Sequence, residues 1–295
     1  MDDRRPPTLR RRALRTAALA LLPAALLVSA PTVEAADDAT LPASAPAPTT
    51  TTPPAPPASD TYDHRVEEGF ASASWWRDWG LGSAPLRTGI ITGRGESALG
   101  IRVEKGTHDG TSWMLPTGDA DDVHVQYRLR LPKNWDVSGT ASNFKLPGFG
   151  NPVRDRRGVC LSGCGGRPAD GVRSYSARGD VDFRGRNGWY IYHAAMPQTA
   201  TSYGMGLRWW GRQEPLQADR WYTIDLRIQM NTPGEHDGVL QAWIDGTNVS
   251  DIVGLRFRDA ASLHVGAAWF DFYFGGSGVA RENMILLVDD IVVEW

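Results

Sequence analysis

The sequence is poor in the residues and patterns on which several protein classes depend. Only two of its 295 residues are cysteine, and their spacing is not the Cys-x-x-Cys of redox proteins. No spacing of His, Cys and carboxylate residues matches a zinc site, so we expect no metal. No apolar run reaches the ~20 residues that a membrane-spanning helix needs, and no long segment has helical periodicity. These absences argue against a thiol redox enzyme, a zinc enzyme and a helical membrane protein.

Glutamate is missing from the central part of the chain. None occurs between His124 and Arg186, and no strand has the pattern Glu-x-Asp-x-x-Glu. A glycoside hydrolase needs two carboxyl groups on either side of the bond that it cleaves. Asp180 and Asp182 are the candidates here, but two residues on one strand lie alongside each other. The sequence therefore disfavours a glycoside hydrolase.

The first 61 residues have the composition of export and spacer segments. Residues 1–35 contain six arginines, then an apolar run, then small residues at a cleavage point, which is typical of a signal peptide. Residues 36–61, rich in Pro, Thr and Ala, predict a disordered, extended linker. We expect a secreted protein without a stable membrane anchor, and the Sec and twin-arginine routes both stay open.

Residues 62–295 predict a single all-β domain. Apolar and polar residues alternate over 123–131 and 222–230, and 239–244 and 284–293 also have the pattern of strands. The whole chain has 32 glycines, which suit the turns between short strands. We predict an antiparallel β-sandwich of two packed sheets, a β-jelly roll.

The two cysteines, Cys160 and Cys164, lie four positions apart in a glycine-rich stretch. In an exported protein this spacing predicts a disulfide that closes a tight loop. The surrounding residues 151–171 could cover a substrate cleft or form a surface insertion, and the sequence leaves both alternatives open.

Charge is distributed unevenly along the chain. The formal net charge is −3, but residues 124–186 hold twelve Lys or Arg against five Asp. A positive region on an acidic protein favours capture of a polyanion, whereas the negative total argues against nucleic acid as a partner. The alternative is that these arginines point in different directions or pair with distant acids.

Three short motifs in the positive region carry groups suited to catalysis. Lys145 lies in Asn-Phe-Lys-Leu-Pro-Gly, Ser176 and Arg178 in Ser-Ala-Arg, and Tyr190 and Tyr192 in Trp-Tyr-Ile-Tyr. On strands, residues two apart project from the same face, so each of the two pairs points one way. We expect these groups to line a solvent-accessible cleft.

The five groups match what β-elimination on an acidic sugar requires. A cation must neutralise the sugar carboxylate and stabilise the enolate-like charge. A base must remove the C5 proton, and an acid must protonate the departing O4. Tyrosine can fill either role if nearby cations lower its pKa. The set needs no cofactor.

In this order the motifs resemble those of polysaccharide lyase family 14, whose members degrade alginate or polyglucuronate. The resemblance runs from about Gln126 to the C-terminus, and further landmarks follow the tyrosines: Arg220-Trp221, Asn231-Thr232-Pro233-Gly234, Asp237-Gly238, Phe274-Gly275-Gly276 and Val288-Asp289-Asp290-Ile291. It implies a β-jelly roll and a lyase that cleaves a uronic-acid polymer by β-elimination. It also implies the catalytic residues, which are Lys145, Ser176, Arg178, Tyr190 and Tyr192. Which tyrosine is acid or base, and whether the lysine is the base, stays open.

Two departures from the family pattern concern the substrate. Asn143 stands in Ser-Asn-Phe, where the family often has glycines, and Asp180 and Asp182 follow Arg178 in place of apolar and aromatic residues. The aspartates could pair with Arg178 or contact sugar hydroxyls. The predicted substrate-binding residues are Arg128, Arg130, Asn143, Asp180 and Gln198.

A carbohydrate-binding module or lectin without catalytic activity is the alternative function. The twelve tryptophans of the chain could stack on sugars in either case. Binding alone does not require the set of lysine, arginine and two tyrosines, so we favour the lyase. We expect a monomer whose partner is an acidic polysaccharide.

Overall fold

A computed structural model describes a folded unit that includes the end of the predicted linker. The chain divides into residues 1–50 and 51–295, and every described residue belongs to the second unit. The described residues are 54–93, 96–135, 143–182, 186–196, 206–209, 215–276 and 278–295, with the backbone alone at 206–209. The predicted signal peptide lies outside them. In these ranges no helix is long and apolar enough to cross a membrane.

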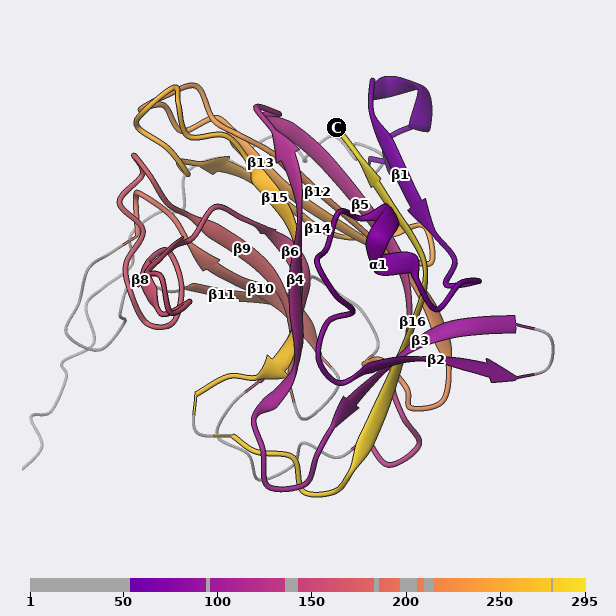
Figure 1. Cartoon of the computed structure of the whole chain (residues 1–295). Helices are drawn as coiled ribbons and strands as arrows, with labels where there is room; N and C mark the ends of the chain where they lie inside the picture. Colours follow the sequence, from indigo (N-terminus) through magenta and orange to yellow (C-terminus); the bar gives the residue numbers. More distant parts are fainter. Residues whose placement is uncertain are drawn as a thin grey trace, which may run out of the picture. The chain divides into compact units, whose positions relative to one another are not determined.

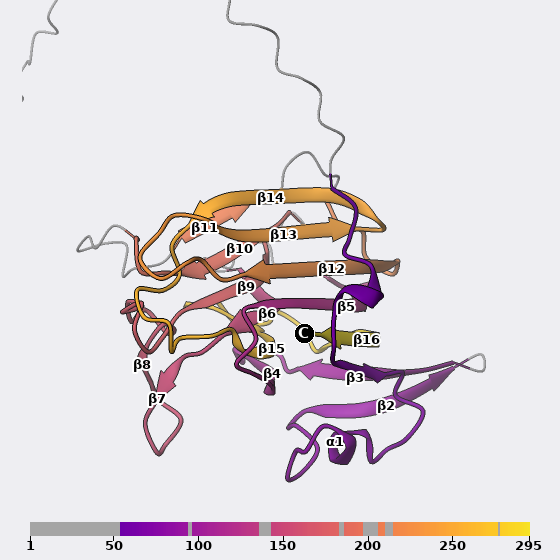
Figure 2. The ribbon, with the colours of Figure 1, turned by 90° about the horizontal axis from the view of Figure 1, so that it is seen from above.

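The described strands form two large antiparallel sheets (Figures 1 and 2). The first sheet has eight strands in the order β14-β13-β12-β5-β16-β3-β2, with β1 beside β16. Its strands are β1 (Arg65–Glu68), β2 (Thr88–Gly93), β3 (Glu96–Val103), β5 (Asp122–Arg130), β12 (Trp221–Gln229), β13 (Gly238–Ile244), β14 (Thr247–Leu255) and β16 (Met284–Glu294).

The second sheet has six described strands in the order β11-β10-β9-β6-β15-β4. Its strands are β4 (Asp109–Gly118), β6 (Phe144–Gly150), β9 (Ser176–Val181), β10 (Asn187–Tyr192), β11 (Gly206–Trp209) and β15 (Gly266–Phe274). Between β6 and β9 the chain forms a small ribbon of β7 (Val153–Arg154) and β8 (Cys160–Ser162). The described helical turns are η1 (Ser59–Thr61) and α1 (Trp75–Asp78).

Residues from both sheets make one hydrophobic core. Val125 of β5 lies opposite Leu226 of β12, and both side chains are fully buried. In the other sheet Trp113 of β4 stacks on Phe270 of β15, with ring centroids 5.0 Å apart. Burying an aliphatic or aromatic side chain of this size stabilises the fold by about 1.5–3 kcal/mol. The predicted β-sandwich is confirmed.

The clearest sequence patterns correspond closely to observed strands. The alternating segments 123–131 and 222–230 form β5 and β12, and 239–244 and 284–293 form β13 and β16. The turn between β13 and β14 is made by Asp245 and Gly246, with φ of 49° and 75°. Positive φ at both central positions is what a tight hairpin requires, because it matches the twist of the paired strands.

The last residues of the predicted linker lie against the eight-stranded sheet. Trp243 of β13 donates its indole N–H to the carbonyl of Pro54 over 2.7 Å. Ser59 accepts a hydrogen bond of 3.0 Å from Arg65 on β1. The chain from Pro54 onward is therefore anchored to the domain by side chains of two strands.

Candidate active site

Three neighbouring strands of the six-stranded sheet carry all five predicted catalytic residues. In the β9–β10 ladder, Tyr190 lies opposite Arg178 and Tyr192 opposite Ser176. On β6, Lys145 lies opposite Asp180 of β9. The residues between them, such as Ala177 and Ile191, belong to the hydrophobic core. Strand alternation therefore turns the five predicted side chains to one face of the sheet, opposite to the face of Ala177 and Ile191.

Lys145 and Asp180 form a buried ion pair between β6 and β9. The Nζ of Lys145 contacts Oδ2 of Asp180 and lies 3.5 Å from the ring centroid of Tyr190. Burial lowers the pKa of Lys145 despite its carboxylate partner. Burial also raises the pKa of Asp180, against the opposing effects of Lys145 and a hydrogen bond from Asn143. The low-polarity surroundings thus favour the neutral form of each group.

Arg178 is held between aromatic rings and two polar groups of β15. Its guanidinium carbon lies 4.4 Å from the ring centroid of Trp269 and 5.3 Å from that of Tyr190. Nη1 donates to a carboxylate oxygen of Asp271 and to the hydroxyl of Tyr273. Burial opposes the charge of Arg178, but the nearby Tyr273 and Asp271 raise its pKa. Arg178 is therefore a permanent cation.

Part of the Arg178 guanidinium is left without a protein partner. The side chain is only 1% exposed, yet Nε and Nη2 have no hydrogen-bond partner among the described residues. A buried donor without a partner is costly, by about 1–3 kcal/mol. These two nitrogens form one edge of the planar guanidinium, which matches the geometry of a carboxylate.

The two predicted tyrosines are hydrogen-bonded to each other. Their hydroxyl oxygens are 2.9 Å apart, and the backbone N–H of Gly166 donates to the hydroxyl of Tyr192 over 2.9 Å. Burial raises the pKa of Tyr190, the neighbouring Tyr192 adds to the shift, and Arg178 only partly opposes it. The condition that nearby cations lower the tyrosine pKa is therefore not met at Tyr190, where burial raises it.

Ser176 connects the sheet to the loop that contains the cysteines. Its hydroxyl is fully buried and donates to the carbonyl of Gly163 over 2.7 Å. The predicted disulfide between Cys160 and Cys164 is confirmed. The loop is thus fixed to the site at Ser176 and, through Gly166, at Tyr192.

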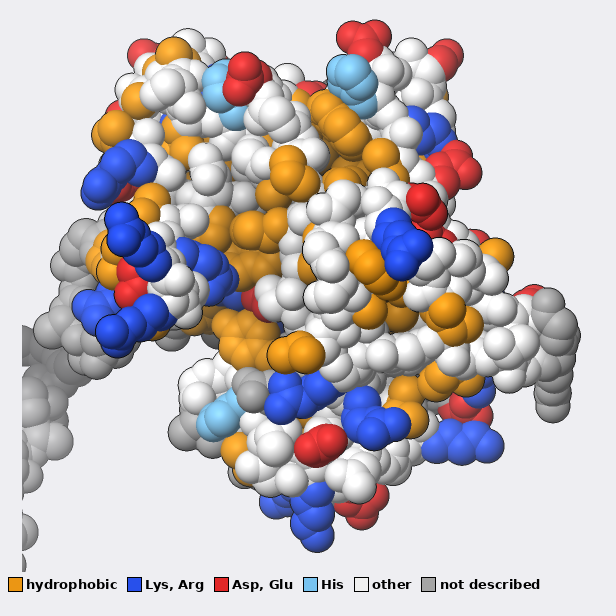
Figure 3. Space-filling view, in the orientation of Figure 1, with side chains coloured by type: hydrophobic (Ala, Val, Ile, Leu, Met, Phe, Trp, Pro, Cys, Tyr) orange, Lys and Arg blue, Asp and Glu red, His pale blue; other side chains and the backbone are white. Residues whose placement is uncertain are grey.

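A cavity of about 220 Å³ lies beside Arg178. Its wall includes Asp271 and Tyr273 of β15 and both cysteines of the disulfide. A neighbouring cavity of about 270 Å³ shares Asp271 and Tyr273 and extends toward β4. In Figure 3, Lys and Arg side chains gather around β8, beside a hollow with hydrophobic side chains in it. Of the two alternatives for residues 151–171, the structure therefore supports a loop beside the site.

The prediction of a solvent-accessible cleft needs correction. Lys145 and Arg178 are 3% and 1% exposed, so they do not lie in an open cleft as expected. The reason is that each is enclosed by an acidic partner and by aromatic rings. Tyr190 is only half-buried and is the most accessible of the five.

The structure describes three of the four remaining predicted substrate-binding residues. Arg128 and Arg130 lie on β5 of the other sheet, where they pair with Asp290 and Asp219. Because β5 belongs to the eight-stranded sheet, they do not lie beside the five predicted catalytic residues, and their role in substrate binding stays a prediction. Asn143 does lie at the site through its bond to Asp180. Gln198 lies outside the described residues.

Three residues of β15 at the site were not among those predicted from the sequence. Trp269, Asp271 and Tyr273 alternate with Phe270 and Phe272, which lie in the core. Polar or amphipathic residues at every second position of an aromatic strand are a signal of a second functional face. The signal is detectable in the sequence, but it does not say which strand lies next to β15.

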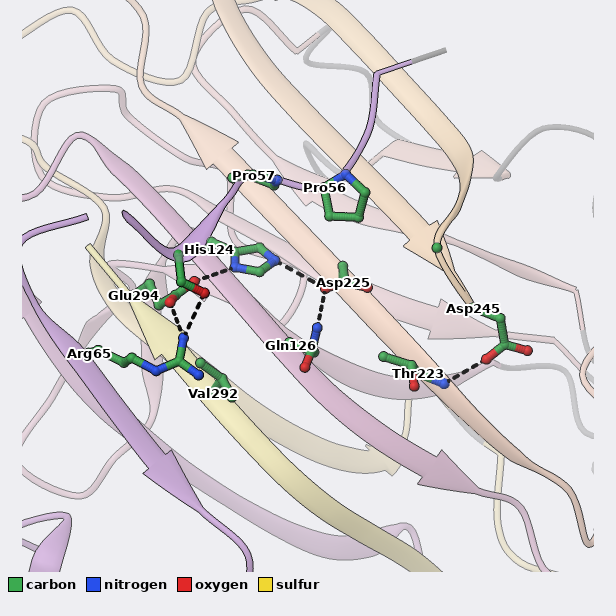
Figure 4. Close-up of a pocket in the computed structure, with 12 residues that line it drawn as sticks. Pro56, Pro57, Arg65, His124, Gln126, Thr223, Asp225, Asp245, Val292 and Glu294 are labelled. Atoms are coloured by element: carbon green, nitrogen blue, oxygen red, sulfur yellow. Dashed lines mark hydrogen bonds and ion pairs between the residues drawn. The ribbon is translucent and has the colours of Figure 1, made fainter. Parts of the chain in front are cut away.

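A separate pocket of about 430 Å³ lies on the eight-stranded sheet (Figure 4). His124 bridges Glu294 and Asp225 there, at 2.9 Å and 3.2 Å. Arg65 pairs with the same Glu294. Because these charged groups satisfy one another, the pocket does not offer the free donors that the Arg178 site offers.

Comparison with known proteins identifies the family. The sequence model of the family described as polysaccharide lyase 14 matches residues 102–280, a range that contains all five predicted catalytic positions. No curated protein sequence matches the chain.

Three solved structures share the fold at low sequence identity. The PL-14 alginate lyase from Aplysia kurodai is 17% identical, with 79% of this chain and 98% of that chain covered and a TM-score of 0.61. A mutant of alginate lyase Aly36B in complex with an alginate tetrasaccharide is 18% identical, with coverages of 78% and 92% and a TM-score of 0.56. The endo-β-1,4-glucuronan lyase from the fungus Trichoderma reesei is 12% identical, with coverages of 79% and 95% and a TM-score of 0.50. The chain belongs to polysaccharide lyase family 14, which confirms the family and the enzyme class predicted from its motifs.

Proposed function

We propose that the protein is a secreted lyase that cleaves a uronic-acid polymer, alginate or polyglucuronate, by β-elimination. One observation carries the proposal: the guanidinium of Arg178 is buried beside a cavity, and two of its donors have no partner among the described residues. A sugar carboxylate is planar, anionic and of matching geometry. The alginate and glucuronan lyases that share the fold agree with such a substrate.

The proposed role of Arg178 is to neutralise the carboxylate of the sugar that loses its proton. Nε and Nη2 bind the two carboxylate oxygens, while Asp271 and Tyr273 hold Nη1 in place. As the C5 proton leaves, negative charge moves onto this carboxylate. A fixed cation in a site that excludes water stabilises that charge strongly.

Lys145 and Tyr190 are the proposed base and acid. Burial lowers the pKa of Lys145, so its amine can lose its proton more readily than an ordinary lysine. The amine takes the C5 proton, the C4–C5 double bond forms, and the C4–O4 bond breaks. Because burial raises the pKa of Tyr190, its hydroxyl is protonated before the reaction, and it gives this proton to the departing O4.

The test is turnover on defined polymers. Purified protein is incubated with polymannuronate, polyguluronate, polyglucuronate and a neutral glucan, and ultraviolet absorbance of the new double bond is followed. We expect product from at least one uronate polymer and none from the glucan. Tight binding of a uronate polymer without any unsaturated product would instead support a carbohydrate-binding module.

Export and domain limits are part of the same proposal. Residues 1–35 are proposed to be a cleaved signal peptide, 36–61 a linker, and 62–295 the lyase domain. The composition of the first 61 residues supports this division. Mass spectrometry of the protein recovered from culture medium should give an N-terminus near Ala36, and recovery of the intact chain in the cell pellet alone would contradict it.

A further inference from the structure

The loop between β6 and β9 brings a second arginine to the cavity that contains Arg178. Arg154 of β7 lines the same cavity. Its guanidinium carbon lies 5.2 Å from the ring centroid of Trp269, and that of Arg178 lies 4.4 Å from the same ring. Two guanidinium groups therefore meet at one indole. The proposed reaction uses only one of them.

The charge of Arg154 is not neutralised by a neighbouring acid. Its side chain is exposed, and Nη1 donates to the neutral carbonyl of Gly158 over 2.9 Å. No carboxylate lies within ion-pair distance of Arg154 in the described part of the chain, in contrast to Arg128 and Arg130. The adjacent Asp155 uses its carboxylate to accept backbone N–H groups of its own turn. Arg154 is thus available to an external anion.

The position of Arg154 is fixed by covalent and hydrogen bonds. In the β7–β8 ribbon, Arg154 lies opposite Cys160, which is joined to Cys164. The same loop is bound to β9 at Ser176 and to β10 at Tyr192. The loop therefore holds Arg154 at a set distance from Arg178, and a fixed pair of cations can distinguish ligands by the spacing of their charges.

We propose that Arg154 binds the carboxylate of a second uronate, adjacent to the one held by Arg178. Both guanidinium groups lie over the buried indole of Trp269, which is part of the wall of the same cavity. Arg154 is then a specificity-determining residue that favours consecutive uronates over a uronate beside a neutral sugar. This inference rests on the proposed function, because it assumes a uronate at Arg178.

The test compares Arg154→Gln with a matched control, Arg157→Gln. Arg157 is exposed on the same loop and lines neither cavity, so both variants lose one positive charge from the loop. Binding of uronate tetrasaccharide and of monomeric uronate is measured by calorimetry in a Tyr190→Phe background, which slows the proposed turnover. Loss of a charge-assisted contact corresponds to about tenfold weaker binding.

We expect Arg154→Gln to weaken tetrasaccharide binding about tenfold and to leave monomer binding unchanged, with less than a twofold effect of Arg157→Gln. Equal losses in the two variants would mean a general charge effect and would overturn the inference. Undiminished tetrasaccharide binding by Arg154→Gln would also overturn it. If the unsubstituted protein neither binds nor cleaves any uronate polymer, the proposed function itself fails, which is a separate outcome.

Discussion

The ion pair between Lys145 and Asp180 leads to a quantitative prediction about stability. Their side chains are 4% and 0% exposed. Replacing Asp180 by Asn keeps the shape but removes the counter-charge, and breaking a buried pair in this way costs about 3–5 kcal/mol. The lysine can limit the cost by losing its proton. Removing the proton from a lysine of ordinary pKa costs about 4–5 kcal/mol at pH 7. An unpaired charged lysine and a deprotonated lysine therefore destabilise the variant by a similar amount.

A double-mutant cycle in urea measures the coupling. Tryptophan fluorescence follows the unfolding of Asp180→Asn, Lys145→Met and the double variant. We expect each single change to lower the free energy of unfolding by about 3–4 kcal/mol at pH 7. The double variant should lose less than the sum by about 2–3 kcal/mol, because it leaves no unpaired charge. The matched control is Asp290→Asn, which removes a surface partner of Arg128 and should cost less than about 1 kcal/mol.

The cost of Asp180→Asn should also depend on pH. Burial already lowers the pKa of Lys145 in the unsubstituted protein, and loss of the Asp180 carboxylate, which opposes this shift, lowers it further in the variant. Between these two pKa values the unfolded state binds more protons, so the free energy of unfolding rises with pH. The deficit of the variant should therefore shrink by up to about 1.4 kcal/mol per pH unit over the pH range in which Lys145 is charged in the unsubstituted protein and neutral in the variant. Two outcomes would refute a charged buried pair. The losses in the free energy of unfolding of the two single variants could simply add in the double variant, or the loss in Asp180→Asn could be the same at every pH.

Three further predictions concern catalysis. Tyr190→Phe should lower kcat about 10²–10⁴-fold with little change in KM, since it removes the proposed acid; near-normal turnover would remove Tyr190 from that role. Since burial lowers the pKa of Lys145, kcat should rise with pH as the amine loses its proton, and an activity that only falls with pH would contradict a lysine base. Replacing Cys160 and Cys164 by Ser should lower kcat, because the loop holds Tyr192; full activity with an unchanged pH profile would show that the disulfide does not position it.

Much of the fold could be predicted because several strands have an unambiguous pattern. β5 and β12 alternate over nine residues each, which fixes both the strand and the face that it buries. The N-terminal strands are harder to recognise. β4 contains Pro116, and β1 is a short strand of mostly charged residues, so neither has a clear alternation. Their place in the sheets depends on pairing with the distant strands β15 and β16.

The site could be predicted as far as local sequence determines geometry. Residues two apart on a strand share a face, so the sequence predicts one face for Ser176 and Arg178 and one face for Tyr190 and Tyr192. The position of Asp271 could not be inferred, because β15 and β6 pair across more than one hundred residues of sequence. For the same reason the sequence could not show that Arg128 lies on the other sheet. Sequence neighbours of a motif can belong to the other sheet.

The glycine of the Lys-Leu-Pro-Gly motif has a steric reason to be there. β6 has an irregular register between Leu146 and Gly148, and Gly148 lies directly opposite Arg178. A Cβ atom at position 148 would be 2.2 Å from the carbonyl oxygen of Ala177 and 2.5 Å from the Cα of Arg178. Both atoms are backbone, so the strands themselves would have to separate. Because Gly148 has no side chain, it lets the strand that carries Lys145 and the strand that carries Arg178 lie close together, although it contributes no reactive group.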